Sequence, residues 1–399
     1  MAKPVDSSDS EDREDGMSRL QIENFAHLRS VDIAFGDLTV LVGPQASGKS
    51  LTLQWLKAAL DGRNIVKALT DAGHPADEPA HLVDLIFGVG MGSGWSADSS
   101  VRWENRAVDP GSLSRRGDKQ GKARLLYIPA HRALLINDGW AQPFQKLGPD
   151  TPVVARLFSQ WLFELFRPAL DGGALFPRER VLKSEYRDRI DAAVFHGGEV
   201  SLREDEGRVR RLHLTHGDVQ LPFMTWTSGQ REFTPLLFGL YSALPPRKQT
   251  KDEHLEWVVI EEPEMGLHPE AITVVLLLCL ELLSRGYRVV VSTHSPLVLS
   301  AVWMLRRLRE IGAGPEFVCD AFDVPARGKT KDVANAALDR GRSLRTFLLK
   351  HGPDGVVSKD ISSLDPGSED DDVSGWGGLA GFGSHFGETV RRAVEASRR

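Results

Sequence analysis

A glycine-rich loop near the start of the chain has the residue types and spacing that bind phosphate. It fits the pattern G-x-x-x-x-G-K-S, follows the apolar run Leu38–Val42, and precedes a predicted helix over Leu51–Leu60. In such a P-loop, backbone N–H groups surround a phosphate, and the helix N-terminus adds the positive end of its dipole. Lys49 would reach the β- and γ-phosphates, and Ser50 would hold Mg²⁺. The residues expected to contact the nucleotide are Gly43, Pro44, Gln45, Ala46, Ser47, Gly48, Lys49, Ser50 and Leu51.

An apolar run farther along the chain ends in two carboxylates, which a nucleotide–metal site requires. Trp257–Ile260 is typical of a buried strand and is followed directly by Glu261 and Glu262. At a strand end beside a P-loop, one acid holds the Mg²⁺ shell and the next can polarise the attacking water. We therefore expect Glu261 to support the metal, through water because it replaces the usual aspartate. Glu262 is expected to act as the general base.

Two further motifs gain their significance from their order along the chain. Ser228, Gly229 and Gln230 begin a predicted helix, where free N–H groups can bind an anion. His294 follows the next predicted strand and can hydrogen bond a γ-phosphate. A lone histidine is more often structural, so a role for His294 depends on the complete set of motifs.

The order of P-loop (Walker A), Ser-Gly-Gln, acidic strand end (Walker B) and histidine loop resembles that of the ABC-type ATPase superfamily. The segments Leu20–Phe25, Ile260–Pro269 and Thr293–Pro296 are similar to those of its OLD/RecF/SMC-like branch, often labelled AAA family ATPases. The resemblance covers roughly residues 18–60, 123–132 and 222–310. It implies an α/β fold of the P-loop NTPase type, an ABC-type ATPase head with a mixed sheet and a helical insert lobe.

The resemblance also implies that ATP and Mg²⁺ are bound between two copies of the chain and that ATP is hydrolysed there. The serine-led element of one copy would cap the nucleotide held by the other, and Met265–His268 would be exchanged across the dimer. The implied roles are catalytic for Glu262, His294 and Lys49, metal-binding for Ser50 and Glu261, and nucleotide-capping for Ser228, Gly229 and Gln230.

Two parts of such a site have no clear counterpart in the sequence. There is no convincing glutamine loop, and His131 or Arg132 is the candidate that could replace it. The adenine contact is not identified, with Phe25 as a candidate. The Ser-Gly-Gln element lacks the second glycine of the transporter form, which argues against a membrane transporter.

The chain is predicted to divide into five parts. Residues 1–16 form a disordered acidic tail, and 17–132 form the first half of the ATPase lobe. Residues 133–222 form a helical insert with a β-hairpin, 223–318 the second ATPase half, and 319–399 a partly ordered C-terminal region. The predicted elements are strands over 19–35, 38–42, 124–129, 256–260 and 287–291, helices over 151–170, 230–243, 269–285, 296–309 and 388–399, and a β-meander over 199–221.

Composition places the chain among ordinary globular proteins and limits its partners. The 399 residues are 41% hydrophobic and 26% charged, with a net charge of −6, so any attraction to nucleic acid must be local. The apolar run Val274–Leu283 is too short to cross a membrane and contains Glu281, which predicts a buried helix. No apolar segment typical of a signal peptide begins the chain. We expect a cytoplasmic protein that does not bind a membrane.

The biological role is left with alternatives. The resemblance suggests prokaryotic anti-phage defence or DNA repair, with a separate effector protein, a nuclease or toxin, under ATPase control. One alternative is a repair ATPase that binds DNA itself; another is a sensor or scaffold with negligible turnover that holds a toxin or nuclease subunit. Non-specific DNA contacts or solubilising surface charges would equally explain four basic clusters: Arg178–Lys183, Arg187–Arg189, Arg208–Arg211 and Arg391–Arg399.

Two relatives within the branch do not fit the sequence. The predicted insert has no sustained heptads, which excludes the long coiled coil of SMC proteins. The C-terminal region lacks the acid spacing of a TOPRIM nuclease domain, and Asp370–Asp372 is interpreted as a solvated acidic run.

Overall fold

The computed structural model describes residues 18–393 apart from 75–77, 115–120, 168–173, 179–181, 205–209, 245–253 and 381–388. The predicted acidic tail, 1–16, and most of the predicted final helix therefore lie outside the described residues.

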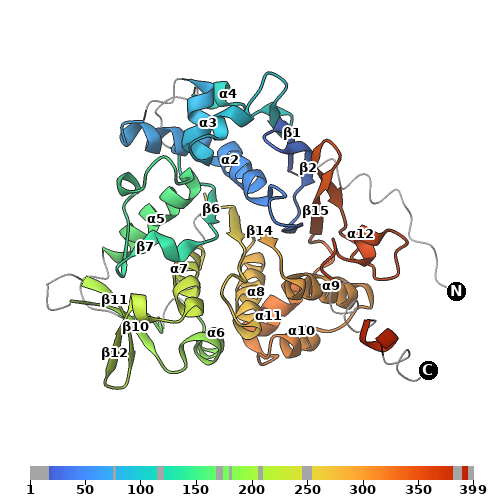
Figure 1. Cartoon of the computed structure of the whole chain (residues 1–399). Coiled ribbons are helices and arrows are strands. Elements are labelled where there is room, and N and C mark those ends of the chain that lie inside the picture. Colours follow the sequence, from blue (N-terminus) through green and yellow to red (C-terminus); the bar gives the residue numbers. More distant parts are fainter. Residues whose placement is uncertain are drawn as a thin grey trace.

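A mixed ten-stranded sheet forms the centre of the molecule, in the order β5-β4-β1-β2-β16-β15-β3-β14-β13-β6 (Figure 1). The strands β15, β3, β14, β13 and β6 are parallel, whereas β1 pairs antiparallel with β2 and β4. The strand bounds are β1 Arg19–Phe25, β2 Leu28–Ala34, β3 Leu38–Val42, β4 Ser100–Trp103, β5 Arg106–Ala107, β6 Leu125–Ile128, β13 Trp257–Glu261, β14 Arg288–Thr293, β15 Leu344–Gly352 and β16 Gly355–Asp360. The mixed sheet expected from the sequence is confirmed.

Helices cover both faces of this sheet, which explains why its central strands are apolar throughout. Side chains alternate between two cores: Val40 and Val42 of β3 face one, and Leu41 faces the other. The core containing Leu41 lies under α2 (Lys49–Asp71) and α3 (Pro79–Phe87). The opposite core lies under three helices, α7 (Ser228–Ala243), α8 (Pro269–Ser284) and α9 (Pro296–Glu310).

Six further helices lie in the described part of the chain. They are α4 Pro110–Ser114, α5 Val153–Phe166, α6 Ser184–Ile190, α10 Pro315–Ala321, α11 Gly328–Leu338 and α12 Asp371–Ser374. No helix in the described part of the chain is long and apolar enough to cross a membrane. The predicted helix with Glu281 is instead α8, whose apolar residues are buried in the core.

The C-terminal hairpin of β15 and β16 is the main element that the sequence analysis missed. β15 pairs in parallel with β3, the strand that leads into the P-loop, and β16 pairs with β2. The side chain of Asp37 accepts from the Ser343 backbone N–H at 2.7 Å, which aligns the start of β15 with that of β3. The region after residue 319 therefore completes the ATPase sheet, through pairings between segments about 300 residues apart that no local pattern reveals.

Residues 133–222 contain one long helix and an antiparallel β-meander. The helix α5 precedes a four-stranded sheet in the order β12-β11-β10-β9. The bounds of these four strands are β9 Ala174–Phe176, β10 Glu199–Glu204, β11 Arg210–His216 and β12 Val219–Pro222. Two short strands, β7 Ile136–Asn137 and β8 Trp140–Ala141, form a separate two-stranded sheet.

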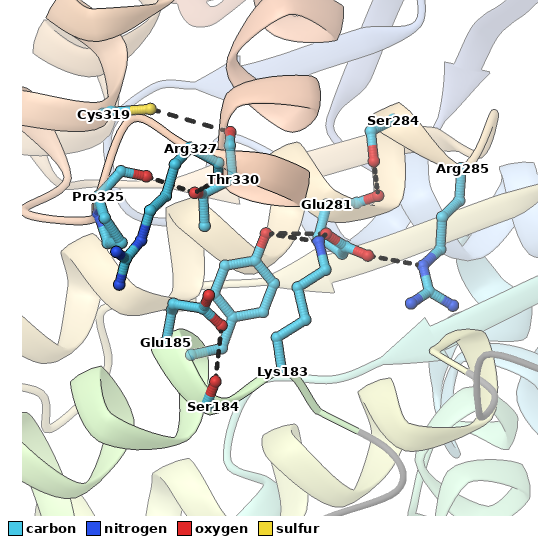
Figure 2. A network of polar contacts seen from close by, with 11 residues as sticks. Lys183, Ser184, Glu185, Glu281, Ser284, Arg285, Cys319, Pro325, Arg327 and Thr330 are labelled. Carbon is cyan, nitrogen blue, oxygen red and sulfur yellow. Dashed lines mark hydrogen bonds and ion pairs between the residues drawn. The ribbon is translucent and has the colours of Figure 1, made fainter.

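A buried polar network attaches the insert to the ATPase core (Figure 2). The Glu281 carboxylate on α8 accepts hydrogen bonds from Lys183, from the Tyr186 hydroxyl at 2.8 Å and from Arg285 Nε at 2.9 Å. Burial alone would raise the pKa of Glu281, but these three partners hold it below its usual value. The acid that interrupts the apolar run is thus the anchor for helix α6 of the insert.

Candidate functional site

The P-loop connects β3 to α2 in a backbone conformation that only glycine permits at two positions. Gly43 and Gly48 have φ values of +150° and +79°. A Cβ on Gly43 would lie 2.2 Å from the carbonyl oxygen of Leu349, and one on Gly48 would lie 2.3 Å from Leu28. The first glycine therefore allows β15 to pack against the loop, and the second allows the β1–β2 turn to do so.

Lys49 lies at the first turn of α2 with its side chain folded over this loop. Its Nζ donates to the carbonyl oxygens of Gly43 at 2.9 Å and Pro44 at 3.1 Å. Burial lowers the pKa of Lys49 to about 8, although the nearby carboxylates of Glu262, Glu264 and Glu261 oppose this shift. The ammonium group is therefore charged at neutral pH and loses its proton in mildly alkaline solution.

This pKa predicts how ATP binding depends on pH. A phosphate binds the charged form of Lys49, so above pH 8 binding must also take up a proton. We expect the affinity for ATP to fall by roughly tenfold between pH 7 and pH 9. The measurement is a titration with a fluorescent ATP analogue at several pH values.

The matched control is Lys49→Arg, whose guanidinium keeps its charge throughout this range. Its affinity should change little between pH 7 and pH 9. An equal loss in both proteins would assign the effect to another group.

The two carboxylates at the end of β13 differ in their surroundings. Glu261 is buried and accepts a hydrogen bond from the Ala130 N–H at 3.2 Å. Burial raises its pKa, while the polar side chains of Ser50 and Tyr127 and the Ala130 N–H oppose the rise. Glu262 is partly exposed, has a φ of +41°, and donates its backbone N–H to Ser292 at 2.9 Å. The positive φ of Glu262 thus turns the chain at the end of β13, so that the Glu261 side chain is buried and the Glu262 side chain is partly exposed.

His294 faces the exposed carboxylate, from the end of the neighbouring strand β14. Its Nε2 lies 3.6 Å from Oε1 of Glu262. Burial and the charge of Lys49 lower the pKa of His294, so the imidazole is neutral at pH 7 and can donate or accept one hydrogen bond. The structure therefore brings Lys49, Glu261, Glu262 and His294 together at the carboxyl ends of three adjacent strands.

Glu264 is a functional residue that the sequence analysis quoted without assigning a role. Its Oε1 accepts from the Thr293 hydroxyl at 2.8 Å and from the His294 N–H at 2.6 Å. It thereby holds the histidine loop against the turn that follows Glu262. The signal was available as the third acid of Glu-Glu-Pro-Glu, but its partner lies 29 residues away and is found only in the folded chain.

The residues present fit a phosphate group and a hydrated Mg²⁺ ion. Oε1 of Glu261 and Oε2 of Glu264 are buried and have no hydrogen-bond partner among the described residues, so each could accept from a metal-bound water. Ser50, at the start of α2, lies beside Glu261. Within the described residues, no group of three or more His, Cys, Asp or Glu side chains could hold a metal ion.

The Ser228–Gln230 element lies at the exposed start of α7. Thr227 and Gln230 form a capping box, and the Gln230 side chain also donates to the Val194 carbonyl at 3.1 Å. A Cβ on Gly229 would lie 3.0 Å from the Gly266 carbonyl, so this element packs against the turn after β13. In the described part of the chain, no hydrogen bond or ion pair joins it to the P-loop of the same protomer.

Two candidates from the sequence prove unable to reach a nucleotide. Phe25 is fully buried, with its ring packed against Trp55 and Phe87, so it is not the adenine contact. Arg132 is also fully buried and donates to backbone carbonyls, so it cannot replace a glutamine loop at the metal. His131 remains exposed beside it.

Several described members of the basic clusters are paired with acids. Arg189 forms an ion pair with Asp323 at 2.6 Å, and Arg211 forms one with Asp138 at 2.6 Å. Arg210 lies 3.8 Å from Glu204. Arg208 and residues 179–181 lie outside the described residues. In the acidic run Asp370–Asp372, the carboxylates of Asp370 and Asp372 both accept hydrogen bonds from Lys359.

The solved structures that are similar to this chain include two heads of SMC proteins. One is the SMC head bound to the C-winged helix domain of ScpA, with 12% identity, coverage of 86% of this chain and 96% of that chain, and a TM-score of 0.41. The other is the SMC head domain from Thermotoga maritima, with 14% identity, coverage of 86% and 98%, and a TM-score of 0.35. A search of curated proteins found no match.

A family model matches residues 38–300, which include all four motifs and more than half of the chain. Its description is "AAA domain, putative AbiEii toxin, Type IV TA system". This match confirms the prediction of an AAA family ATPase, and the family suggests ATP binding and hydrolysis. The protein belongs to the AAA-domain family described as the putative AbiEii toxin of a Type IV TA system.

Proposed function

We propose that the protein hydrolyses ATP at two sites formed between two copies of the chain. The observation that carries this proposal is the convergence of Lys49, Glu261, Glu262 and His294, with His294 Nε2 3.6 Å from Glu262 Oε1. A phosphate-binding lysine, a buried acid beside the P-loop serine and a second, more accessible acid are the parts that phosphoryl transfer to water needs.

Each group has a distinct task in this proposal. The P-loop amides and Lys49 bind the β- and γ-phosphates, and Ser50 and Glu261 hold the Mg²⁺ shell, with Mg²⁺ supplying neutralisation of phosphate charge. Glu262 accepts the proton of the attacking water. His294, held by Glu264, donates a hydrogen bond to the γ-phosphate or to that water. Most of the rate enhancement comes from positioning and from fixed charges.

The site requires a second copy because one of its parts faces outward. The start of α7 presents exposed Ser228 and the free N–H groups of a helix N-terminus, which favour an anion. Ser228, Gly229 and Gln230 of one protomer would then cap the nucleotide bound by Gly43–Leu51 of its partner. Gln230 would act mainly by fixing the cap, because its side chain is bonded within its own protomer.

A mixing experiment tests whether the cap acts between protomers. Lys49→Ala removes the phosphate lysine of one protein, and Ser228→Arg blocks the cap of another. Each variant alone should be inactive, whereas an equimolar mixture should regain activity. Random assortment places one intact site in half of the dimers, so the mixture should reach about one quarter of wild-type turnover.

Wild-type protein at matched concentration, with and without ATP, provides the control for dimer mass. Failure of the mixture to regain turnover, with exchange of subunits shown by mass, would mean that the cap does not act in trans. A wild-type protein that turns over ATP as a monomer would contradict the dimer itself.

The biological role extends this proposal. The family description points to a toxin–antitoxin context, so ATP-driven closing and opening would control a separate toxin or nuclease in the cytoplasm, in anti-phage defence or DNA repair. We also propose the division of the chain into five parts. In this division, the region 319–399 contributes the strands β15 and β16 to the sheet of the ATPase lobe. Non-specific DNA is the alternative ligand, and it would stimulate turnover in a salt-dependent way.

A further inference from the structure

Arg132 is a fully buried arginine at the centre of the candidate site. It follows β6 in a short helical turn, Arg132–Leu135, that packs beside α7. Its Nε donates to the Glu232 carbonyl oxygen at 2.9 Å, and its Nη1 donates to the carbonyl oxygens of Pro129 at 3.3 Å and Glu261 at 3.1 Å. These three partners belong to different segments, since Pro129 follows β6, Glu261 ends β13 and Glu232 lies in α7.

One guanidinium therefore connects the carboxylate pair to the cap helix. The Glu261 carbonyl lies in the peptide unit that leads into Glu262, and the Glu262 carbonyl lies 3.5 Å from the same Nη1. Glu232 lies in the second turn of α7, a few residues after Ser228. The planar fork of arginine can hold these directions at once, which the single ammonium of a lysine cannot do.

Arg132 keeps its charge despite its burial. Burial lowers its pKa to about 10, and four nearby glutamates, Glu232, Glu264, Glu261 and Glu262, oppose this shift. The guanidinium is thus charged at neutral pH. The hydrogen-bond geometry of Arg132 and its charge can be tested separately, because a lysine at this position keeps the positive charge but lacks the planar guanidinium.

We propose that Arg132 is a positioning residue that holds Glu262 and the start of α7 as one rigid unit, so that the catalytic acid of one ATP site and the cap of the other move together. The proposal rests on the proposed function, in which Ser228 acts on the nucleotide of the partner. Arg132 is excluded from solvent, and its effect is transmitted through the backbone carbonyls to which it donates.

The test compares Arg132→Lys and Arg132→Gln with a control arginine that is buried elsewhere. Arg156 on α5 is also fully buried and packs over the Phe144 ring at 4.0 Å, and its guanidinium has no hydrogen-bond partner in the part of the chain that the structure describes. Arg156→Lys therefore controls for the general effect of changing a buried arginine. The readouts are kcat and KM for ATP, the thermal midpoint, and amide hydrogen exchange of peptides over 226–236 and 258–268.

Arg132→Lys is expected to lower kcat by at least about tenfold while KM changes by less than about threefold, because the P-loop is untouched. Exchange should rise in both peptides together, and Arg156→Lys should change neither kcat nor exchange in these peptides. Arg132→Gln should show the same pattern with a larger loss. Unchanged kcat, or a loss matched by Arg156→Lys, would overturn the proposal.

The exchange measurement separates this proposal from the proposed function. If wild-type protein shows no turnover or no ATP-dependent dimer, the proposed function fails, yet the two peptides must still loosen together in Arg132→Lys. Exchange that rises in only one of them, or in neither, would show that Arg132 does not join the two segments.

Discussion

Replacing Glu262 by glutamine is expected to reduce ATP turnover by about 10²–10⁴-fold, the usual contribution of a general base. The amide keeps the size of the side chain and can still accept a hydrogen bond from His294, but it cannot take a proton from water. ATP binding should survive because Lys49 and the P-loop are unchanged. The variant should therefore accumulate as an ATP-bound dimer, detected by mass in the presence of ATP and Mg²⁺.

The control for this experiment is Glu270→Gln on the first turn of α8, a nearby exposed glutamate. Its turnover should match that of the wild type. If Glu262→Gln retained wild-type turnover, Glu262 would not be the general base. If the wild-type protein formed an ATP-bound dimer but did not hydrolyse ATP, the sensor or scaffold alternative would be favoured.

Replacing Lys49 by alanine should abolish measurable turnover and weaken ATP binding by roughly tenfold to a hundredfold. The lysine is the only described cation within hydrogen-bond reach of the loop carbonyls of Gly43 and Pro44, where a bound phosphate would compete for it. A hydrogen bond to a charged group contributes about 1.5–3 kcal/mol, which corresponds to this loss of affinity. The measurement is a titration with a fluorescent ATP analogue, followed by mass analysis for loss of the dimer.

Lys67→Ala is the matched control, since Lys67 lies on the same helix and forms a surface ion pair with Asp71 at 2.9 Å. Its affinity for ATP should equal that of the wild type. Undiminished binding in Lys49→Ala would show that the nucleotide is bound elsewhere.

The local elements of the fold could be predicted because their signals are local. β3 has the predicted bounds, and the helices with Pro269 and Pro296 at their first turns begin where proline favours a helix start. The P-loop could be recognised because its glycines, lysine and serine are consecutive. The predicted helix end at Leu60 coincides with a kink in α2, where Asp61 has non-helical φ and ψ values of −124° and 22°. The helical turns beyond the kink, which end at Asp71, were not predicted, and their apolar residues lie in the same core as those of β1 and β2.

The elements that were missed depend on contacts between distant parts of the chain. β15 and β16 have modest apolar patterns, and their place in the sheet is set by pairing with β3 and β2. Arg132 and Glu281 could not be assigned because their meaning depends on burial. In the sequence, Arg132 was a candidate to replace the glutamine loop. In the structure it is buried and donates hydrogen bonds to backbone carbonyls.

The sequence by itself determined the ligand class and the order of the motifs, because a phosphate loop and a strand ending in acids are encoded in consecutive residues. Only the tertiary structure decided which acid is buried and which is accessible, that Glu264 holds the histidine loop, and that Arg132 joins β13 to α7. These properties arise from desolvation and from hydrogen bonds between strands and helices far apart in the chain, and neither is expressed in local spacing.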